Sequence, residues 1–343
     1  MFERPPFDIL QDSLADPSNP IGMRMRALYY LRQAHHDDEK LQGSVVQALG
    51  RGLLEEKHGS LMRHEFAYVM GQLRDERCCH VLEQVLAQPD DNIMVRHEAA
   101  EALGAIGASR SKTVLEKVMV DNPDTPELSD TCQLALNVMH WRATGGDPLD
   151  MPAACACMLN PYSSVDPAPP HPTHAAMSFS ALGELLCDAE RTIFERYRAM
   201  FSLRNRGGEA AVVELCRALT QDTSSALLRH EVAYVLGQMQ HPSSVESLEA
   251  SLRRTDEHEM VRHESAEALG AIDGRWEDVE RVLLEFVNDQ DDVVKESCLV
   301  ALDAADYWGH ARQGDDDCPK KSNFNNQKNR DERVLVNHFN VKV

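Results

Sequence analysis

The sequence has few aromatic residues and fewer basic than acidic ones, and both shortages exclude classes of protein. Phe, Trp and Tyr make up only 6 % of the 343 residues although 43 % are apolar, so the core must consist of Leu, Ala, Val and Met, as in helical proteins. Lys and Arg number 35 against 56 Asp and Glu, a net charge of 35 − 56 = −21. This charge excludes a general binder of nucleic-acid phosphates and favours cationic partners.

Long apolar runs and regular cysteine spacings are also absent. No run approaches the roughly 18 apolar residues of a membrane-spanning helix, and the start, MFERPPFDIL, has neither the basic leader nor the apolar segment of a signal peptide. The nine cysteines are odd in number and include no C-x-x-C pair, which disfavours a disulfide framework. Cys155 and Cys157 form a C-x-C that could bind a soft metal. We expect a cytoplasmic protein without nucleic-acid or membrane partners.

Four copies of one segment predict the architecture. They are RHEFAYVMGQ from Arg63, RHEAAEALGAI from Arg96, RHEVAYVLGQ from Arg229 and RHESAEALGAI from Arg262. Their histidines are 33 residues apart within each half (97 − 64 and 263 − 230), and the halves are offset by 166 residues (230 − 64). Two further pairs of segments are more weakly similar. RMRALYYLR at 24–32 resembles RYRAMFSLR at 196–204, and TCQLAL at 131–136 resembles SCLVAL at 297–302. The sequence therefore contains two halves of about four repeats each.

A period in the thirties, rich in Ala and Leu with short polar breaks, is typical of stacked helix pairs. We expect an all-α fold, an α-solenoid of about eight helix pairs in two pseudo-symmetric arms of four. The predicted parts are an N-terminal arm (1–143), a Pro/Gly-rich linker (144–178), a C-terminal arm (179–312) and a disordered tail (313–343). The closing VLVNHFNVKV alternates like a strand, and we assign it no role.

The repeated histidine lies away from the predicted core of its helix. At 100° per residue, Phe66, Val69 and Leu73 share one stripe, and His64 falls on the opposite side. The helix around His97 has the same arrangement. This helical phase excludes the interpretation that the repeated histidine is a structural residue of the core. A solvated face would accept any polar residue, whereas all four copies keep the same His-Glu pair.

Neutral imidazole and carboxylate together suit a divalent first-row metal ion. Neighbouring helices lie about 8–10 Å apart, so His64 and His97 can converge with a Glu neighbour, and His230 and His263 can do the same. The two resulting sites would form a dinuclear centre if the arms fold toward each other. Two His and one carboxylate with open positions favour Fe(II) and O2, whereas structural zinc prefers Cys-rich sites. The candidate ligands are His64, Glu65, His97, Glu98, His230, Glu231, His263 and Glu264.

Further polar residues share the face of the histidines. Tyr68, Tyr234, Glu101 and Glu267 each follow a motif histidine by four residues, which places them beside it. The glutamates could accept the second ring N–H of a metal-bound histidine, although helix solubility explains them equally well. The arginine before each motif histidine is expected to form an ion pair between repeats rather than to act in catalysis.

The sequence resembles the deoxyhypusine hydroxylases, HEAT-repeat di-iron monooxygenases that complete hypusine formation on translation initiation factor 5A. The resemblance runs from about 24 to 308 and includes the four His-Glu motifs, SVDPAPP at 164–170 and FERYRAMFSLRNRGGE at 194–209. It implies hydroxylation of a deoxyhypusine side chain by O2, with two Fe2+ ions and an external electron donor. It further implies one iron held by His64, His97 and Glu98, another held by His230, His263 and Glu264, and the cationic substrate tail bound by Glu65 and Glu231, with some metal contact.

Two functions of other classes stay open. A non-catalytic acidic HEAT-repeat scaffold could bind a basic protein, and it would keep binding after metal removal. A lyase related to the bilin-attaching helical-repeat proteins shares the Ala-Leu-Gly phrase, but that family does not require four His-Glu pairs. The stretch 144–159 and the tail beyond 313 do not follow the hydroxylase pattern, so the resemblance assigns them no role.

Overall fold

The structure is a computed structural model, described for residues 4–146, 159–272 and 274–312. These residues form sixteen α-helices and no strand, which confirms the predicted all-α solenoid of eight helix pairs. The outer helices are α1 (Phe7–Ala15), α3 (Gln42–Leu54), α5 (Cys79–Leu86), α7 (Lys112–Asp121), α9 (Phe179–Cys187), α11 (Glu209–Gln221), α13 (Val245–Arg253) and α15 (Trp276–Phe286). The inner helices are α2 (Ile21–Asp37), α4 (Gly59–Leu73), α6 (Ile93–Ile106), α8 (Pro126–Ala143), α10 (Ile193–Arg206), α12 (Ala226–Met239), α14 (Glu259–Ala271) and α16 (Asp292–Arg312).

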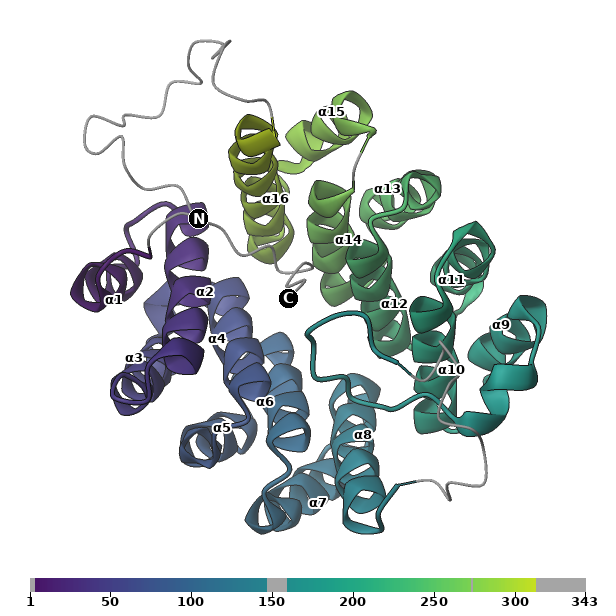
Figure 1. Cartoon of the computed structure of the whole chain (residues 1–343), viewed down its shortest axis with the longest axis horizontal. Helices are drawn as coiled ribbons and strands as arrows, with labels where there is room; N and C mark the ends of the chain where they lie inside the picture. Colours follow the sequence, from purple (N-terminus) through teal and green to yellow (C-terminus); the bar gives the residue numbers. More distant parts are fainter. Residues whose placement is uncertain (1–3, 147–158, 273, 313–343) are drawn as a thin grey trace.

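The inner helices follow one another around the centre of a ring, and the outer helices cover its periphery (Figure 1). Helices α1–α8 form one arm and α9–α16 the other. At one junction α8 packs against α10 and α12, and at the other α16 packs against α2 and α4. The two arms therefore meet at both ends, and α4 and α6 face α12 and α14.

Polar side chains at the helix starts explain where several inner helices begin. Asn92 accepts a hydrogen bond from the Met94 N–H at 2.8 Å, and Ser225 accepts one from Leu228 at 3.1 Å. These side chains satisfy backbone donors that the first turn leaves unpaired. Each of these two helices, α6 and α12, therefore begins four residues before its motif histidine (97 − 93 and 230 − 226).

Glycines in the motif let consecutive inner helices approach closely. A Cβ atom on Gly71, Gly104 or Gly270 would lie 2.8 Å from the Cα atom of Ala102, Ala135 or Ala301, respectively. Real Cβ atoms do not approach backbone so closely, so a larger residue would push the helices apart. Gly71 of YVMGQ thus brings the histidine-bearing helices α4 and α6 together, and the EALGAI glycines Gly104 and Gly270 do the same for α6 with α8 and for α14 with α16.

The arginine before the motif histidine joins consecutive repeats, as expected, in three of the four copies. Arg63 pairs with Asp91 at 2.6 Å, Arg262 with Asp289 at 2.6 Å, and Arg229 with Glu257 at 2.6 Å. Within the described residues, Arg96 instead donates to the carbonyl oxygens of Leu86 and Pro89, at 3.2 and 3.3 Å.

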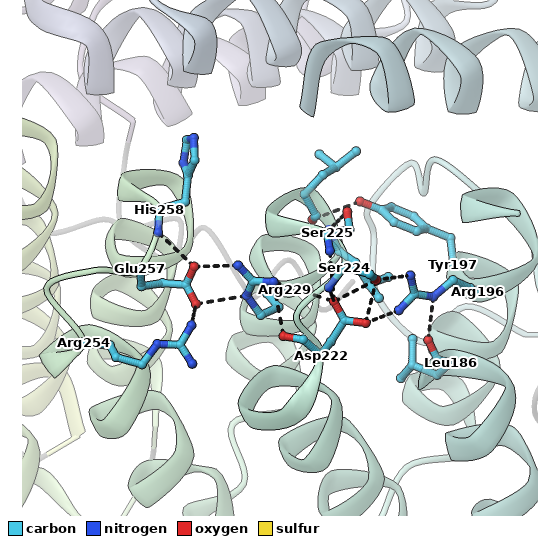
Figure 2. A network of polar contacts seen from close by, with 12 residues as sticks. Leu186, Arg196, Tyr197, Asp222, Ser224, Ser225, Arg229, Arg254, Glu257 and His258 are labelled. Atoms are coloured by element: carbon cyan, nitrogen blue, oxygen red, sulfur yellow. Dashed lines mark hydrogen bonds and ion pairs between the residues drawn. The ribbon is translucent and has the colours of Figure 1, made fainter. Parts of the chain in front are cut away.

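In the second arm these pairs extend into a chain of alternating charges (Figure 2). Arg196 pairs with Asp222, Arg229 lies between Asp222 and Glu257, and Arg254 pairs with Glu257. The side chains of Asp222 and Glu257 are only 3 % and 1 % exposed. Because removal of one partner from a buried ion pair costs about 3–5 kcal/mol, this network links consecutive repeats of the second arm.

Part of the predicted linker has a defined path. Residues 159–178 include the short helix η5 (Pro172–Ala176), and their first half crosses the middle of the ring between α6 and α12 (Figure 1). The four ranges predicted for arms, linker and tail stay predictions. The tail 313–343, its strand-like end, and the pair Cys155 and Cys157 lie outside the described residues.

Two expectations from composition can be compared with the described part of the chain. Its six cysteines are free thiols, namely Cys78, Cys79, Cys132, Cys187, Cys216 and Cys298. No described helix combines the length and the apolar composition needed to cross a lipid bilayer.

Candidate metal centre

The four motif histidines form a single cluster. Within each arm, the ring centroids of His64 and His97 are 5.5 Å apart and those of His230 and His263 are 5.4 Å apart. Between the arms, His97 lies 5.3 Å from His230, and His64 lies 5.4 Å from His263. The arms therefore face each other with their histidines, as a dinuclear centre requires.

All four histidines are buried, with exposed fractions of 0 to 4 %. The helical phase of the sequence placed them away from the core of their own repeat. The opposite arm covers that face, so the imidazoles lie inside the ring, away from solvent. The sequence did not predict this burial because the covering histidines lie 133 and 199 positions away in the chain (230 − 97 and 263 − 64).

The carboxylates of the second motif in each arm lie against these rings. Glu98 Oε2 is 3.2 Å from His64 Nε2, and Glu264 Oε2 is 3.4 Å from His230 Nε2 and 3.9 Å from His263 Nε2. Ligand atoms of His64, His97 and Glu98 all lie within 4.8 Å of one another, which is the set expected for one iron. A second such set joins His230 and His263 to His64, so His64 lies between the two groups.

The unpaired ring nitrogens fit a metal ion. Both ring nitrogens of His97 and His230, and the Nε2 atoms of His64 and His263, are buried without a hydrogen-bond partner, and so is Oε1 of Glu264. Glu98 lies near His64 Nε2, but outside hydrogen-bonding geometry. Buried polar atoms are nearly always satisfied, so seven such atoms in one cluster indicate groups that need a bound cation. Imidazole nitrogens and carboxylate oxygens match Fe(II).

Comparison with known proteins decides the family. HEAT repeats match residues 46–137 and 225–303. The deoxyhypusine hydroxylase of Xenopus laevis is 48 % identical over 86 % of this chain and 89 % of its own length, and that of Homo sapiens is 42 % identical over 88 % and 91 %. The chain belongs to the deoxyhypusine hydroxylase family. The solved structure of human deoxyhypusine hydroxylase in complex with glycerol superposes with a TM-score of 0.76 at 40 % identity, covering 88 % of this chain and 96 % of that one.

Charges and burial set the protonation of the histidines in this member of the deoxyhypusine hydroxylase family. Burial, followed by the neighbouring imidazoles, holds the pKa of His97 and His263 well below the usual histidine value. Burial also lowers the pKa of His64, but Glu98 and Glu65 outweigh it and raise that pKa well above the usual value. His97 and His263 are therefore neutral near pH 7, the form in which imidazole can bind a metal.

The two candidate substrate carboxylates, Glu65 and Glu231, have different surroundings. Glu65 Oε2 accepts a hydrogen bond from the Tyr29 hydroxyl at 2.6 Å, and its Oε1 lies 3.2 Å from His64 Nδ1. Burial and then the charge of Glu98 raise the pKa of Glu231 well above the usual value. So many buried carboxylates disfavour one another's charged forms, and a metal or amine cation would relieve this.

Four residues were expected beside the histidines, and the structure supports this for some of them but not for all. Tyr68 and Tyr234 lie one helical turn beyond the ring cluster, and their hydroxyl oxygens are 2.9 Å apart. Glu267 Oε1 lies 3.7 Å from His263 Nδ1. Glu101 does not serve His97 in this way, because His97 Nδ1 has no hydrogen-bond partner.

Tyr29 and Ser297 also reach the cluster, and neither was among the residues predicted from the sequence. The Ser297 hydroxyl donates to Glu267 Oε1 at 2.9 Å and lies 3.4 Å from His263 Nδ1. In the other arm the matching repeat positions hold Phe201 and Thr131. Phe201 lacks the hydroxyl of Tyr29, so the repetition gives no signal for Tyr29. Thr131 keeps a hydroxyl at the position of Ser297, so the pairing of TCQLAL with SCLVAL was a signal that could have indicated Ser297.

Proposed function

We propose that this chain hydroxylates the deoxyhypusine side chain of translation initiation factor 5A, with two Fe2+ ions, O2 and an external electron donor. Family membership, at 48 % identity to the Xenopus relative over most of both chains, supports the reaction class. The single observation that carries the metal assignment is the buried cluster of His and Glu atoms without hydrogen-bond partners. The cytoplasm stays the compartment we expect.

In this proposal each arm would contribute the ligands of one iron. His64, His97 and Glu98 would hold the first ion, and His230, His263 and Glu264 the second. When bound, the iron pair with O2 supplies the insertion of one oxygen atom into a C–H bond, while the other leaves as water with two electrons and two protons from the donor. The protein supplies the neutral imidazoles of His97 and His263 and a site from which both arms exclude bulk water.

Glu65 and Glu231 would bind the amines of the substrate tail. They adjoin His64 and His230 in the chain, so a cation bound between them would lie next to the metals. The Tyr29 hydroxyl holds one of the two carboxylates in place at 2.6 Å. A fixed carboxylate sets the position of an amine along the side chain, which decides the carbon that faces the metals.

The test is iron content and product formation in matched variants. Purified protein should hold about two irons per chain and hydroxylate deoxyhypusine-bearing factor 5A when a reductant and O2 are present. His97→Ala and His263→Ala should lower iron content and abolish hydroxylation, because each removes a ligand. His36→Ala, an exposed histidine outside the cluster, serves as the control.

Hydroxylation by iron-free protein, or by the two histidine variants, would contradict the proposal. Binding of a basic partner that survives iron removal and His→Gln substitution, without hydroxylation, would favour the acidic scaffold instead.

A further inference from the structure

The inner helices that carry the site run parallel. His64 contacts His97, and one to two turns later Gly71 contacts Ala102, so α4 and α6 point the same way. Across the ring, His64 lies near His230 and Tyr68 near Tyr234, so α12 shares that direction. The ring therefore has one end formed by the starts of these helices and another formed by their ends.

The histidines lie close to the N-terminal end of the ring. Each is four or five residues past the first residue of its helix (64 − 59, 97 − 93, 230 − 226 and 263 − 259). At 1.5 Å per residue, the cluster lies about 6–8 Å from the helix starts. A side chain entering there would need to cross only one turn of helix.

Side chains from both arms meet on the other side of the histidines. The Tyr68–Tyr234 pair lies one turn beyond them, and these tyrosines are 7 % and 8 % exposed. Gln72 and Gln238, the last residues of YVMGQ and YVLGQ, lie one further turn along and are 9 % and 3 % exposed. The Gln238 side chain donates to the Tyr234 hydroxyl at 3.1 Å, so the glutamines contact the tyrosine pair.

Residues 164–170, which we call the strap, lie over these glutamines. Gln72 Oε1 accepts the Val165 N–H at 2.8 Å, and Gln238 Nε2 donates to the Ser164 hydroxyl at 3.1 Å. Both arms thus bind the same short segment. The equivalent Gln in each arm, the last residue of the first motif, makes this contact.

A buried arginine fixes the strap. Arg204 is 1 % exposed and forms two hydrogen bonds with Asp166, at 2.5 and 2.9 Å, and one with Gln238 Oε1 at 2.8 Å. Arg198 donates to the carbonyl oxygens of Pro169 and Pro170, at 2.8 and 3.0 Å. A bidentate ion pair and consecutive prolines hold this segment in one conformation.

We propose that the strap closes the C-terminal end of the ring behind the histidines, so that the substrate protein docks on the N-terminal end. The proposal deepens and rests on the proposed function. The docking partner is a folded protein that extends a long cationic side chain into the ring. Asp90 and Asp256, equivalent exposed residues before α6 and α14, lie at this end and suit a cationic partner.

Site-specific photo-cross-linking distinguishes the two ends. We would place p-benzoylphenylalanine at Asp90 or Asp256 on the N-terminal end, and at Glu76 or Ser243, exposed residues just past α4 and α12, on the C-terminal end. Iron-loaded full-length variants would be irradiated with deoxyhypusine-bearing factor 5A. We expect at least about tenfold more cross-linked complex from the N-terminal positions, abolished by excess unlabelled substrate protein.

Cross-links mainly from Glu76 and Ser243, in variants that still hydroxylate the substrate, would overturn the docking proposal and leave the proposed function intact. Equal cross-linking from both ends would also overturn it. Absence of cross-links at all four positions together with absence of hydroxylation would overturn both proposals.

Discussion

At the scale of single residues, the equivalent glutamates Glu65 and Glu231 have different surroundings in the two arms. Glu65 is held by the Tyr29 hydroxyl at 2.6 Å, whereas the matching position in the second arm is Phe201, which has no hydroxyl. Glu231 instead has a pKa raised by burial and by nearby carboxylates. The two equivalent carboxylates therefore differ in their hydrogen bonding and in their electrostatic surroundings.

Tyr29→Phe should weaken substrate binding without removing iron. Loss of one hydrogen bond to a charged group costs about 1.5–3 kcal/mol, so we expect KM to rise by about tenfold or more. Steady-state kinetics with metal analysis of the same samples measures both effects. Tyr162→Phe, outside the histidine cluster, is the control. Loss of iron in Tyr29→Phe would instead mean that Glu65 acts mainly as a metal ligand.

At the scale of helices, the start of α14 carries a titratable group with a displaced pKa. Burial, followed by hydrogen bonding with Asp291 and its charge, raises the pKa of Glu259 from 4.5 to about 7. The folded state therefore binds this proton more tightly than the unfolded chain does. The stabilisation is fully present below about pH 4.5 and is lost as the pH rises through about 7.

Glu259→Gln should accordingly stabilise the protein at high pH. The amide stays neutral, so it avoids the cost of a carboxylate beside Asp291. We expect Tm at pH 8 to exceed that of the parent chain by a few degrees, with little difference at pH 5. Thermal unfolding at both pH values tests this, with Glu190→Gln, an exposed acid, as the control. A larger gain at pH 5 than at pH 8 would contradict the assignment.

At the scale of the whole molecule, two kinds of contact close the ring. Helices meet at both junctions between the arms, and the strap is bound by Gln72 from one arm and Gln238 from the other. The pair between Arg204 and Asp166 anchors this second contact, because the Arg204 side chain is 0 % exposed. The strap therefore helps to keep the two sets of histidines facing each other.

Asp166→Ala should destabilise the protein and release the strap. It leaves a buried guanidinium without its carboxylate, which costs about 3–5 kcal/mol. Amide hydrogen exchange at Val165, whose N–H donates to Gln72, should become much faster. Asp121→Ala removes an exposed pair with Lys117 and should change neither property. Unchanged protection at Val165 would show that the strap does not depend on Arg204.

Much of the fold could be predicted because its causes are local in the sequence. The apolar spacing, the capping residues and the glycines specify each helix pair, and their repetition specifies a solenoid. The histidine phase within a single helix also sufficed to place His64 away from the core of its repeat. The ion pairs of Arg63, Arg229 and Arg262 followed from the repeat spacing in the same way.

The sequence by itself thus determined the helix pairs, the repeated His-Glu motif and its phase, since these depend on neighbours within a few turns. Only the tertiary structure decided that the four imidazoles are buried in one cluster, that Tyr29 and Ser297 reach it, and that Asp166 meets Arg204. These contacts join residues from different repeats or from the linker, and they depend on how the ring closes. No local pattern specifies that closure, because it results from packing between whole arms.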